Sequence, residues 1–197
     1  MSKRFLLFGE KPFDAYALEK FSAIASDIDR MSDVEALIYK ESFEELVQKT
    51  VNTYAFTRLD ISFENKMVDL IDRQLKSGNR IFAEYSLVVT GDAYYLGLTP
   101  YQSGFRQFNL PVELKENILA FEIDTFYHNE ELLPEVMEAV KTEYERIKKY
   151  ILDCLYNINQ TIMYYNSELE KFVIPLLANK LRKAERCVKI KEALNFR

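Results

Sequence analysis

The last third of the chain carries an apolar pattern that is typical of one long helix. Apolar positions recur there at alternating spacings of three and four, which is the seam of a coiled coil. The seam consists of Val140, Tyr144, Ile147, Ile151, Cys154, Ile158, Thr161 and Tyr165. The helix should begin near Pro134, because proline fits the first helical turn.

Polar residues at the end of this seam predict a turn. Asn166 and Ser167 interrupt the pattern, and the sequence from Ser167 to Glu170 matches a capping box that opens a second helix. Pro175 should kink that helix or delay its start. Two helices joined by a short turn lie antiparallel. We therefore expect residues 132–197 to form a helical hairpin, or coiled-coil extension.

Residues 1–131 predict a domain in which helices precede an antiparallel sheet. Helical spacing covers residues 13–31 and 32–54, and β-type patterns cover 58–64, 67–73, 80–90, 93–98 and 118–124. We place a turn at 65–66. The short connections exclude parallel crossovers. The predicted class is α+β, with N-terminal helices, a small antiparallel β-sheet of four or five strands and a long C-terminal antiparallel helical hairpin.

Residue types that perform catalysis are sparse. His128 is the only histidine, the two cysteines fall in helical patterns, and neither a nucleophile elbow nor a glycine-rich phosphate loop is present. Zinc would need several closely spaced Cys or His ligands. We expect no enzyme, no catalytic, cofactor-binding or metal residue, and no cofactor. A carboxylate site among the 31 acidic residues stays an open alternative.

Composition places the chain among globular proteins of the cytoplasm. Apolar residues make up 48% and charged residues 29%, which argues against wholesale disorder. No run of 18 apolar residues suggests a membrane span, and the short apolar run near the N-terminus does not suggest a signal peptide. We expect a cytoplasmic protein without a membrane partner.

Charge is unevenly distributed along the chain. The net charge is −5, yet residues 179–191 contain six basic residues and one acidic residue, Glu185. Solvated charge at a helix C-terminus, an acidic protein partner and a nucleic acid would each explain this segment. The partner contacts we predict are Lys180, Arg182, Lys183 and Arg186.

The seam itself predicts a second interface. It needs more cover than a returning helix of about 25 residues supplies, and uncovered apolar stripes usually mark interfaces. The residues we expect to pack in an oligomer or against a partner are Ile147, Ile151, Ile158 and Ile162.

Several short motifs over residues 81–196 occur in a fixed order. They are Gly91-Asp92, Thr99-Pro100, the strand Ile118–Asp124, Tyr165-Asn166-Ser167-x-Leu169, Leu181-Arg182-Lys183 and Leu194-Asn195-Phe196. This order resembles the N-terminal scaffold region of multidomain bacterial antiphage-defence proteins, in which a nuclease or Toll/interleukin-receptor effector domain follows. Pro175 departs from that pattern, and so does the end of the chain where the effector would begin. The resemblance implies an effector subunit on another polypeptide.

Three hypotheses follow for the function. The first is a non-catalytic scaffold or regulatory subunit of a bacterial antiviral-defence-type assembly, as a homo-oligomer or with a protein partner. The second is a nucleic-acid-binding module that uses the basic helix. The third is an enzyme with a carboxylate site that no motif reveals.

Overall fold

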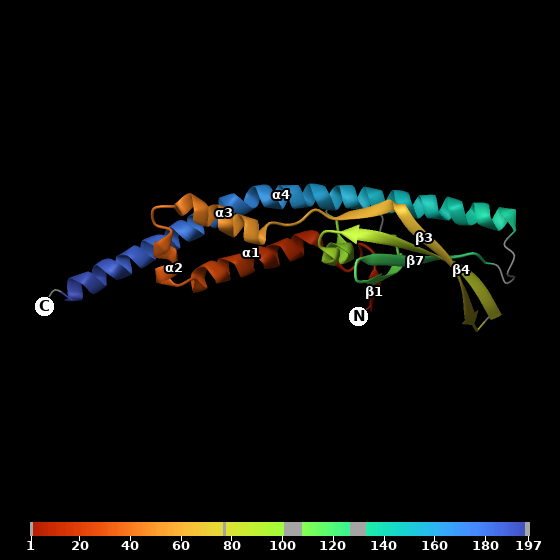
Figure 1. Cartoon of the computed structure of the whole chain (residues 1–197), viewed down its shortest axis with the longest axis horizontal. Coiled ribbons are helices and arrows are strands. Elements are labelled where there is room, and N and C mark those ends of the chain that lie inside the picture. The colour runs from red at the N-terminus through yellow and green to blue at the C-terminus, as the bar shows by residue number, and fades with distance from the viewer. Residues whose placement is uncertain (1, 77, 101–107, 127–132, 196–197) are drawn as a thin grey trace. The chain divides into compact units, whose positions relative to one another are not determined.

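The computed structural model describes residues 2–76, 78–100, 108–126 and 133–195. It confirms the predicted α+β class and the antiparallel sheet (Figure 1). The elements in chain order are β1 (Ser2–Leu6), β2 (Lys11–Pro12), α1 (Phe13–Arg30), α2 (Asp33–Ile38), α3 (Phe43–Tyr54), β3 (Asp60–Leu75), β4 (Gly78–Thr90), the 3-10 helix η1 (Ala93–Gly97), β5 (Leu98–Thr99), β6 (Pro111–Lys115), β7 (Ile118–Asp124) and α4 (Pro134–Asn195).

The chain divides into two compact units, each built from two separate stretches of sequence. Unit 1 comprises Met1–Phe13 and Thr57–Thr161, and unit 2 comprises Asp14–Phe56 and Ile162–Arg197. This division differs from the predicted one at residues 131 and 132. Helix α4 contributes its first part to unit 1 and its second part to unit 2.

Unit 1 is built on a five-stranded antiparallel sheet with the order β1-β6-β7-β4-β3. Strands β2 and β5 form a separate two-stranded parallel pair. Strand β1 was not predicted, because only Phe5 of its five residues is buried and so the sequence shows no alternation. It pairs with β6, more than a hundred residues later in the chain.

One face of this sheet is covered by the first part of α4 (Figure 1). Alternate residues are buried along β7 and along β4 from Ile81 to Val89. Tyr85 of β4 stacks on Tyr144 of α4 with ring centroids 4.4 Å apart, and Phe8 contacts Tyr150 edge-on. The burial of these rings fixes α4 on the sheet.

Two local predictions in the sheet are wrong. Strand β3 does not turn at residues 65–66; it continues as one strand whose register shifts between Ser62 and Met67. Residues 93–97 form η1 rather than a strand, because the Asp92 carboxylate accepts the Tyr94 N–H and caps that helix. Gly91 has φ +91°, and a Cβ atom there would collide with the carbonyl oxygen of Arg58.

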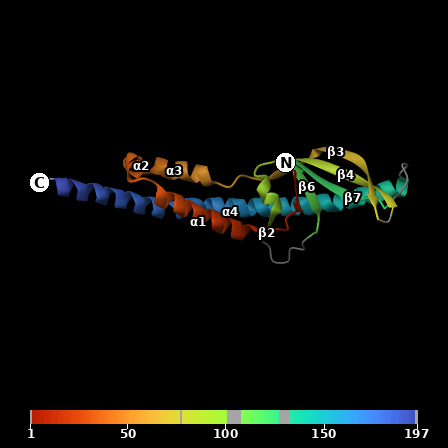
Figure 2. The same cartoon turned by 90° about the horizontal axis from the view of Figure 1, so that it is seen from below.

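Unit 2 is a helical unit in which α1 and α3 lie against the second part of α4 (Figure 2). The helix expected over residues 32–54 is split into α2 and α3, and Ser32 caps α2 by accepting the Glu35 N–H. Apolar side chains from all three longer helices form its core. The core residues are Ile24, Ile28, Leu46, Val47, Leu169, Val173 and Leu177.

The predicted helical hairpin is wrong, because α4 is one helix of 62 residues. Ser167 stays helical and donates its hydroxyl to the Tyr164 carbonyl, so its polar group is satisfied without a turn. Pro175 removes one N–H from the helix. Val173 and Leu177, on either side of Pro175, belong to the same core, and this packing holds the helix together across the proline.

Two asparagines of α4 each bind the backbone of one residue in the segment between α3 and β3. In unit 1, Asn159 accepts the Leu59 N–H at 3.0 Å and donates to the Leu59 carbonyl at 2.8 Å. In unit 2, Asn166 does the same to Phe56 at 2.8 and 2.9 Å. A side-chain amide thus supplies both hydrogen bonds that a neighbouring strand would supply. Asn166, which predicted a break between two helices, therefore lies within one helix and forms hydrogen bonds to a distant segment.

Candidate partner-binding surface

The four isoleucines predicted for an interface are buried within the chain itself. Ile147, Ile151 and Ile158 lie in unit 1, Ile162 lies in unit 2, and none is more than 3% exposed. The prediction that the seam is left uncovered is therefore wrong. It assumed that only a returning helix would cover the seam, whereas in unit 1 α4 packs on the sheet. These residues stabilise the fold and offer no surface to a partner.

Of the four predicted basic contacts, Lys180 is engaged within unit 2. Its ammonium donates to the Asp29 carbonyl at 3.1 Å and lies 3.6 Å from the Asp33 carboxylate, and its side chain is 15% exposed. Glu185 of α4 forms a second ion pair with Lys40 at 3.4 Å. These contacts connect α4 to Asp29 in α1, to Asp33 in α2 and to Lys40 between α2 and α3.

The remaining predicted cations belong to a larger exposed group. We call this group the basic end, and it consists of Arg182, Lys183, Arg186, Lys189 and Lys191. All five side chains are exposed, and none forms an ion pair with a residue that the structure describes. Arg182 donates only to the Ala178 carbonyl of its own helix, at 3.4 Å. Their charge is thus available to a partner.

Helical geometry places three members of the basic end opposite the core-facing side of α4. Arg182, Arg186 and Lys189 are spaced by four and three residues and form one stripe. The stripe rises about 10 Å along the helix. Ala184, on the other side, is fully buried. In Figures 1 and 2 the last turns of α4 extend past α2 and α3.

The last turns of α4 also expose apolar side chains. Val188, Ile190 and Leu194 are all accessible, whereas Leu177 and Ala184 earlier in the same helix are buried. A helix segment of this length is marginal on its own in water, because helices in proteins are stabilised mainly by packing. A partner would bury these side chains and pair the cations at the same time.

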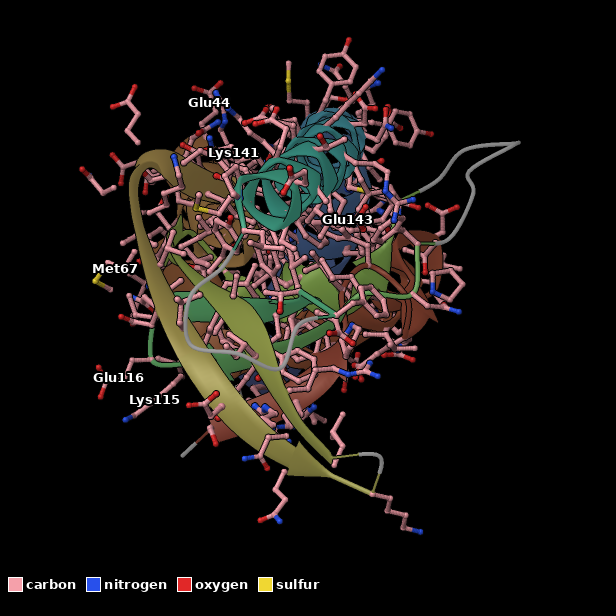
Figure 3. All side chains as sticks on the ribbon, turned by 90° about the vertical axis from the view of Figure 1, so that its right-hand side faces the viewer. Glu44, Met67, Lys115, Glu116, Lys141 and Glu143 are labelled. Carbon is pink, nitrogen blue, oxygen red and sulfur yellow. The ribbon has the colours of Figure 1, made fainter. Side chains whose placement is uncertain are left out.

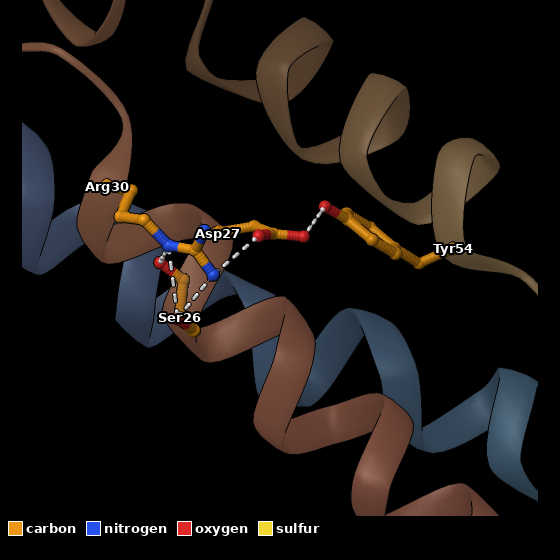
Figure 4. Close-up of polar contacts among 4 residues, drawn as sticks. All are labelled: Ser26, Asp27, Arg30 and Tyr54. Atoms are coloured by element: carbon orange, nitrogen blue, oxygen red, sulfur yellow. Dashed lines mark hydrogen bonds and ion pairs between the residues drawn. The ribbon is translucent and has the colours of Figure 1, made fainter.

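A network of polar and ionisable groups joins α1 to α3 (Figure 4). The Tyr54 hydroxyl donates to Asp27 at 2.7 Å, and Arg30 reaches both Ser26 at 2.8 Å and Asp27 at 3.3 Å. The hydrogen bond to Asp27, together with partial burial, raises the pKa of Tyr54. The phenol therefore stays protonated and links the helices.

The sheet face away from α4 carries a cluster of charged side chains. A cavity of about 630 Å³ there is lined by Glu84, Glu122, Glu113, Arg73 and Arg4, among others. Arg73 pairs with Glu122, and Arg4 pairs with Glu113 at 2.8 Å. Burial, followed by the charge of Glu122, raises the pKa of Glu84.

The cavity is lined by carboxylates and arginines rather than by nucleophilic side chains. No serine, cysteine or histidine is among the described residues that line it. Of its four glutamates, Glu113 and Glu122 are paired with arginines and Glu10 lies 3.7 Å from the Lys3 ammonium, which leaves Glu84 without an ion pair among the described residues. Sequence reasoning missed this cluster, although Glu84 and Glu122 each alternate with apolar residues and are opposite one another on β4 and β7. That alternation was the signal available.

Searches for other kinds of site were negative over the described part of the chain. Within residues 2–76, 78–100, 108–126 and 133–195, no group of three or more His, Cys, Asp or Glu residues could hold a metal ion. In the same ranges, no helix combines the length and the hydrophobicity needed to cross a bilayer. His128, the one candidate for base catalysis, lies outside the described residues. Comparisons with protein-family models, curated proteins and solved structures found no match for this chain.

Proposed function

We propose that this chain is a non-catalytic scaffold or regulatory subunit that binds a protein partner through the basic end of α4. The observation that carries the proposal is the contrast between Lys180, which is paired within unit 2, and Arg182, Lys183 and Arg186, which are exposed. Charges needed only for the internal fit of unit 2 would be paired as Lys180 is. Unpaired cations beside exposed apolar side chains form a composite surface of the kind that protein interfaces use.

The resemblance to scaffold regions of antiphage-defence proteins suggests the setting for this binding. In that setting the partner is an effector subunit on another polypeptide, and its contact surface is acidic with an apolar centre. Electrostatic attraction to such a surface would accelerate association and select the partner. The proposal requires no catalytic residue in this chain.

The test is a double charge reversal, Arg182→Glu with Arg186→Glu. The tagged chain and its variant are expressed in the cells that naturally make it, and proteins retained in stoichiometric amount are quantified by mass spectrometry. We expect a retained acidic protein whose recovery falls at least about tenfold in the variant, because two attractive contacts become repulsive.

A matched control separates this effect from a change in total charge. Lys149→Glu with Lys171→Glu changes the net charge by the same amount at exposed positions elsewhere on α4. The control should retain the partner. Recovery of the same amount of partner with the wild-type chain and with the Arg182→Glu, Arg186→Glu variant would overturn the proposal.

Nucleic acid is the second candidate, because the same stripe could neutralise phosphates. Three phosphate contacts by Arg182, Arg186 and Lys189 would give a slope of about −2.7 for log K against log salt on duplex DNA. No aromatic residue occurs within residues 179–191 to stack on bases. Fluorescence anisotropy with a labelled duplex at several salt concentrations distinguishes the candidates. A steep salt dependence that disappears in the Arg182→Glu, Arg186→Glu variant would favour nucleic acid as the partner.

A further inference from the structure

Strand β3 is the long, exposed edge of the sheet in unit 1. It occupies the end of the strand order, and no described strand pairs with its outer side. Residues 64–70 are exposed without interruption. By contrast, the strand at the opposite edge, β1, is short: it has five residues, whereas β3 has 16. Exposed edges of this length usually pair with another chain or are blocked by charges and proline.

The exposed run contains three large apolar side chains. Met67, Val68 and Leu70 are 56%, 47% and 57% exposed. Figure 3 shows Met67 pointing outward from the strand. Burying such side chains by strand addition is favourable, and main-chain hydrogen bonds along the edge add to the affinity. The edge therefore combines unpaired backbone with apolar surface.

The two faces of the strand are fixed by its pairing with β4. Val68 is opposite Tyr85 and Asp72 is opposite Ile81, which places both on the face that α4 covers. Met67 and Ile71 are opposite Ser86 and Phe82 on the other face. These assignments decide which side chains would meet across a new edge.

Lys66 belongs to the face that α4 covers. Its ammonium lies 5.4 Å from the centre of the Tyr144 ring. Across an antiparallel pair, directly opposite side chains share a face and interact most strongly. Lys66 can therefore meet a residue such as Asp72 of a neighbouring strand.

We propose that β3 pairs antiparallel with β3 of a second copy of this chain, about a two-fold axis at Asp69. In this register Val68 is opposite Leu70, Met67 is opposite Ile71, and Lys66 is opposite Asp72, each pair occurring twice. Apolar side chains thus meet apolar ones on both faces. Unlike charges meet at both ends of the contact, which gives the charge complementarity that selects a second copy as the occupant.

Neighbouring registers lack this complementarity. Centring the axis on Leu70 sets Val68 against Asp72, and centring it on Val68 sets Met67 against Asp69. Centring it on Ile71 sets Leu70 against Asp72, and it matches Asp69 with Arg73, whose guanidinium is already paired with Glu122. The Asp69 register has one unfavourable pair, the two Asp69 carboxylates on the axis, which should limit the strength of the dimer.

Sedimentation velocity on the full chain over a range of concentrations tests the proposal. We expect a reversible monomer–dimer equilibrium. Val68→Lys with Leu70→Lys should raise the dimer dissociation constant at least about tenfold, since every apolar pair on one face is lost. The matched control is Leu18→Lys with Ile38→Lys, at exposed apolar positions in α1 and α2. This control should leave the dimer dissociation constant unchanged. Circular dichroism confirms that each variant is folded.

A charge swap tests the register itself. Lys66→Asp and Asp72→Lys should each weaken the dimer about threefold or more, and the double variant should restore it to within about twofold of wild type. Asp69→Asn should tighten the dimer about threefold or more by removing the repulsion on the axis. Monomeric behaviour of both wild type and Asp69→Asn would overturn the proposal. The proposal would also be overturned if the Val68→Lys, Leu70→Lys variant dimerised as strongly as the wild-type chain. A double variant no tighter than the single variants would overturn the register.

Discussion

The seam and the basic end belong to the same helix, yet one is buried and the other is exposed. The seam residues Ile147, Ile151 and Ile158 are covered within unit 1, whereas Arg182 and Arg186 face solvent in unit 2. Periodicity defines the apolar face of a helix in both places. What covers that face is decided by segments far away in the sequence, namely the alternating strands β4 and β7. A long apolar stripe is therefore no proof of an intermolecular interface.

Each of the two regions contains or adjoins one cysteine. The reactivities of the two thiols should show the largest difference between the seam and the basic end. Cys154 is buried in the seam, and burial raises its pKa to about 12, whereas Cys187 is exposed near the basic end. The thiolate fraction of Cys154 should fall about a thousandfold below that of an ordinary thiol. A thiol reagent should modify Cys187 rapidly and Cys154 only after denaturation. Two fast thiols in the native chain would show that the seam is uncovered.

Truncation of a seam residue should cost much of the stability. Ile151→Ala removes a fully buried side chain, and we expect the free energy of unfolding to fall by about 2–5 kcal/mol in urea titrations. Leu152→Ala, next to it but 46% exposed, should cost less than about 1 kcal/mol. Equal costs at these adjacent positions would contradict the burial of the seam.

The asparagine contacts should give an intermediate effect. Asn166→Ala leaves the Phe56 N–H and carbonyl without their side-chain partner, at a cost of about 1–3 kcal/mol. Amide hydrogen exchange at Phe56 should accelerate. Gln160→Ala is the control, because Gln160 is exposed on the same helix. Unchanged exchange at Phe56 would mean that the amide does not hold this backbone.

High pH should give the smallest effect. Burial, with a hydrogen bond to Asp14, raises the pKa of Tyr165 to about 12. The folded state thus favours the neutral phenol, so this stabilisation is complete below pH 10 and is lost as the pH rises through 12. We expect a loss on the order of 1 kcal/mol after allowing for solvent screening. Tyr165→Phe should remove this part of the pH dependence, measured by urea unfolding at several pH values.

Much of the fold could be predicted from the sequence. Regular alternation identified β7, a β-rich run identified β4, and spacings of three and four identified the first part of α4, whose remainder was assigned to a separate helix. The errors share one cause. Asn166 and Ser167 favour turns when considered locally, but here Asn166 bonds the backbone of Phe56, which lies 110 positions away in the sequence. Strand β1 likewise exists because β6 pairs with it.

The candidate surfaces were predictable only in part. Local charge density identified Arg182, Lys183 and Arg186, since a cluster of cations is visible without a structure. The sequence did not reveal that Lys180 would be paired with Asp33, because that contact joins two helices. Nor did it reveal that β3 would be a sheet edge, since strand order depends on pairings between distant segments.

The interleaved construction of the units has a consequence for biosynthesis. The apolar faces of α1 and α3 are complete once Tyr54 has been translated, but their core also needs Leu169, Val173 and Leu177 of α4. At about 5–20 residues per second, the ribosome needs several seconds or more to reach those residues. Until then Ile24 and Leu46 lack the helix that buries them. The nascent chain is therefore most vulnerable to aggregation while the strands of unit 1 are being synthesised.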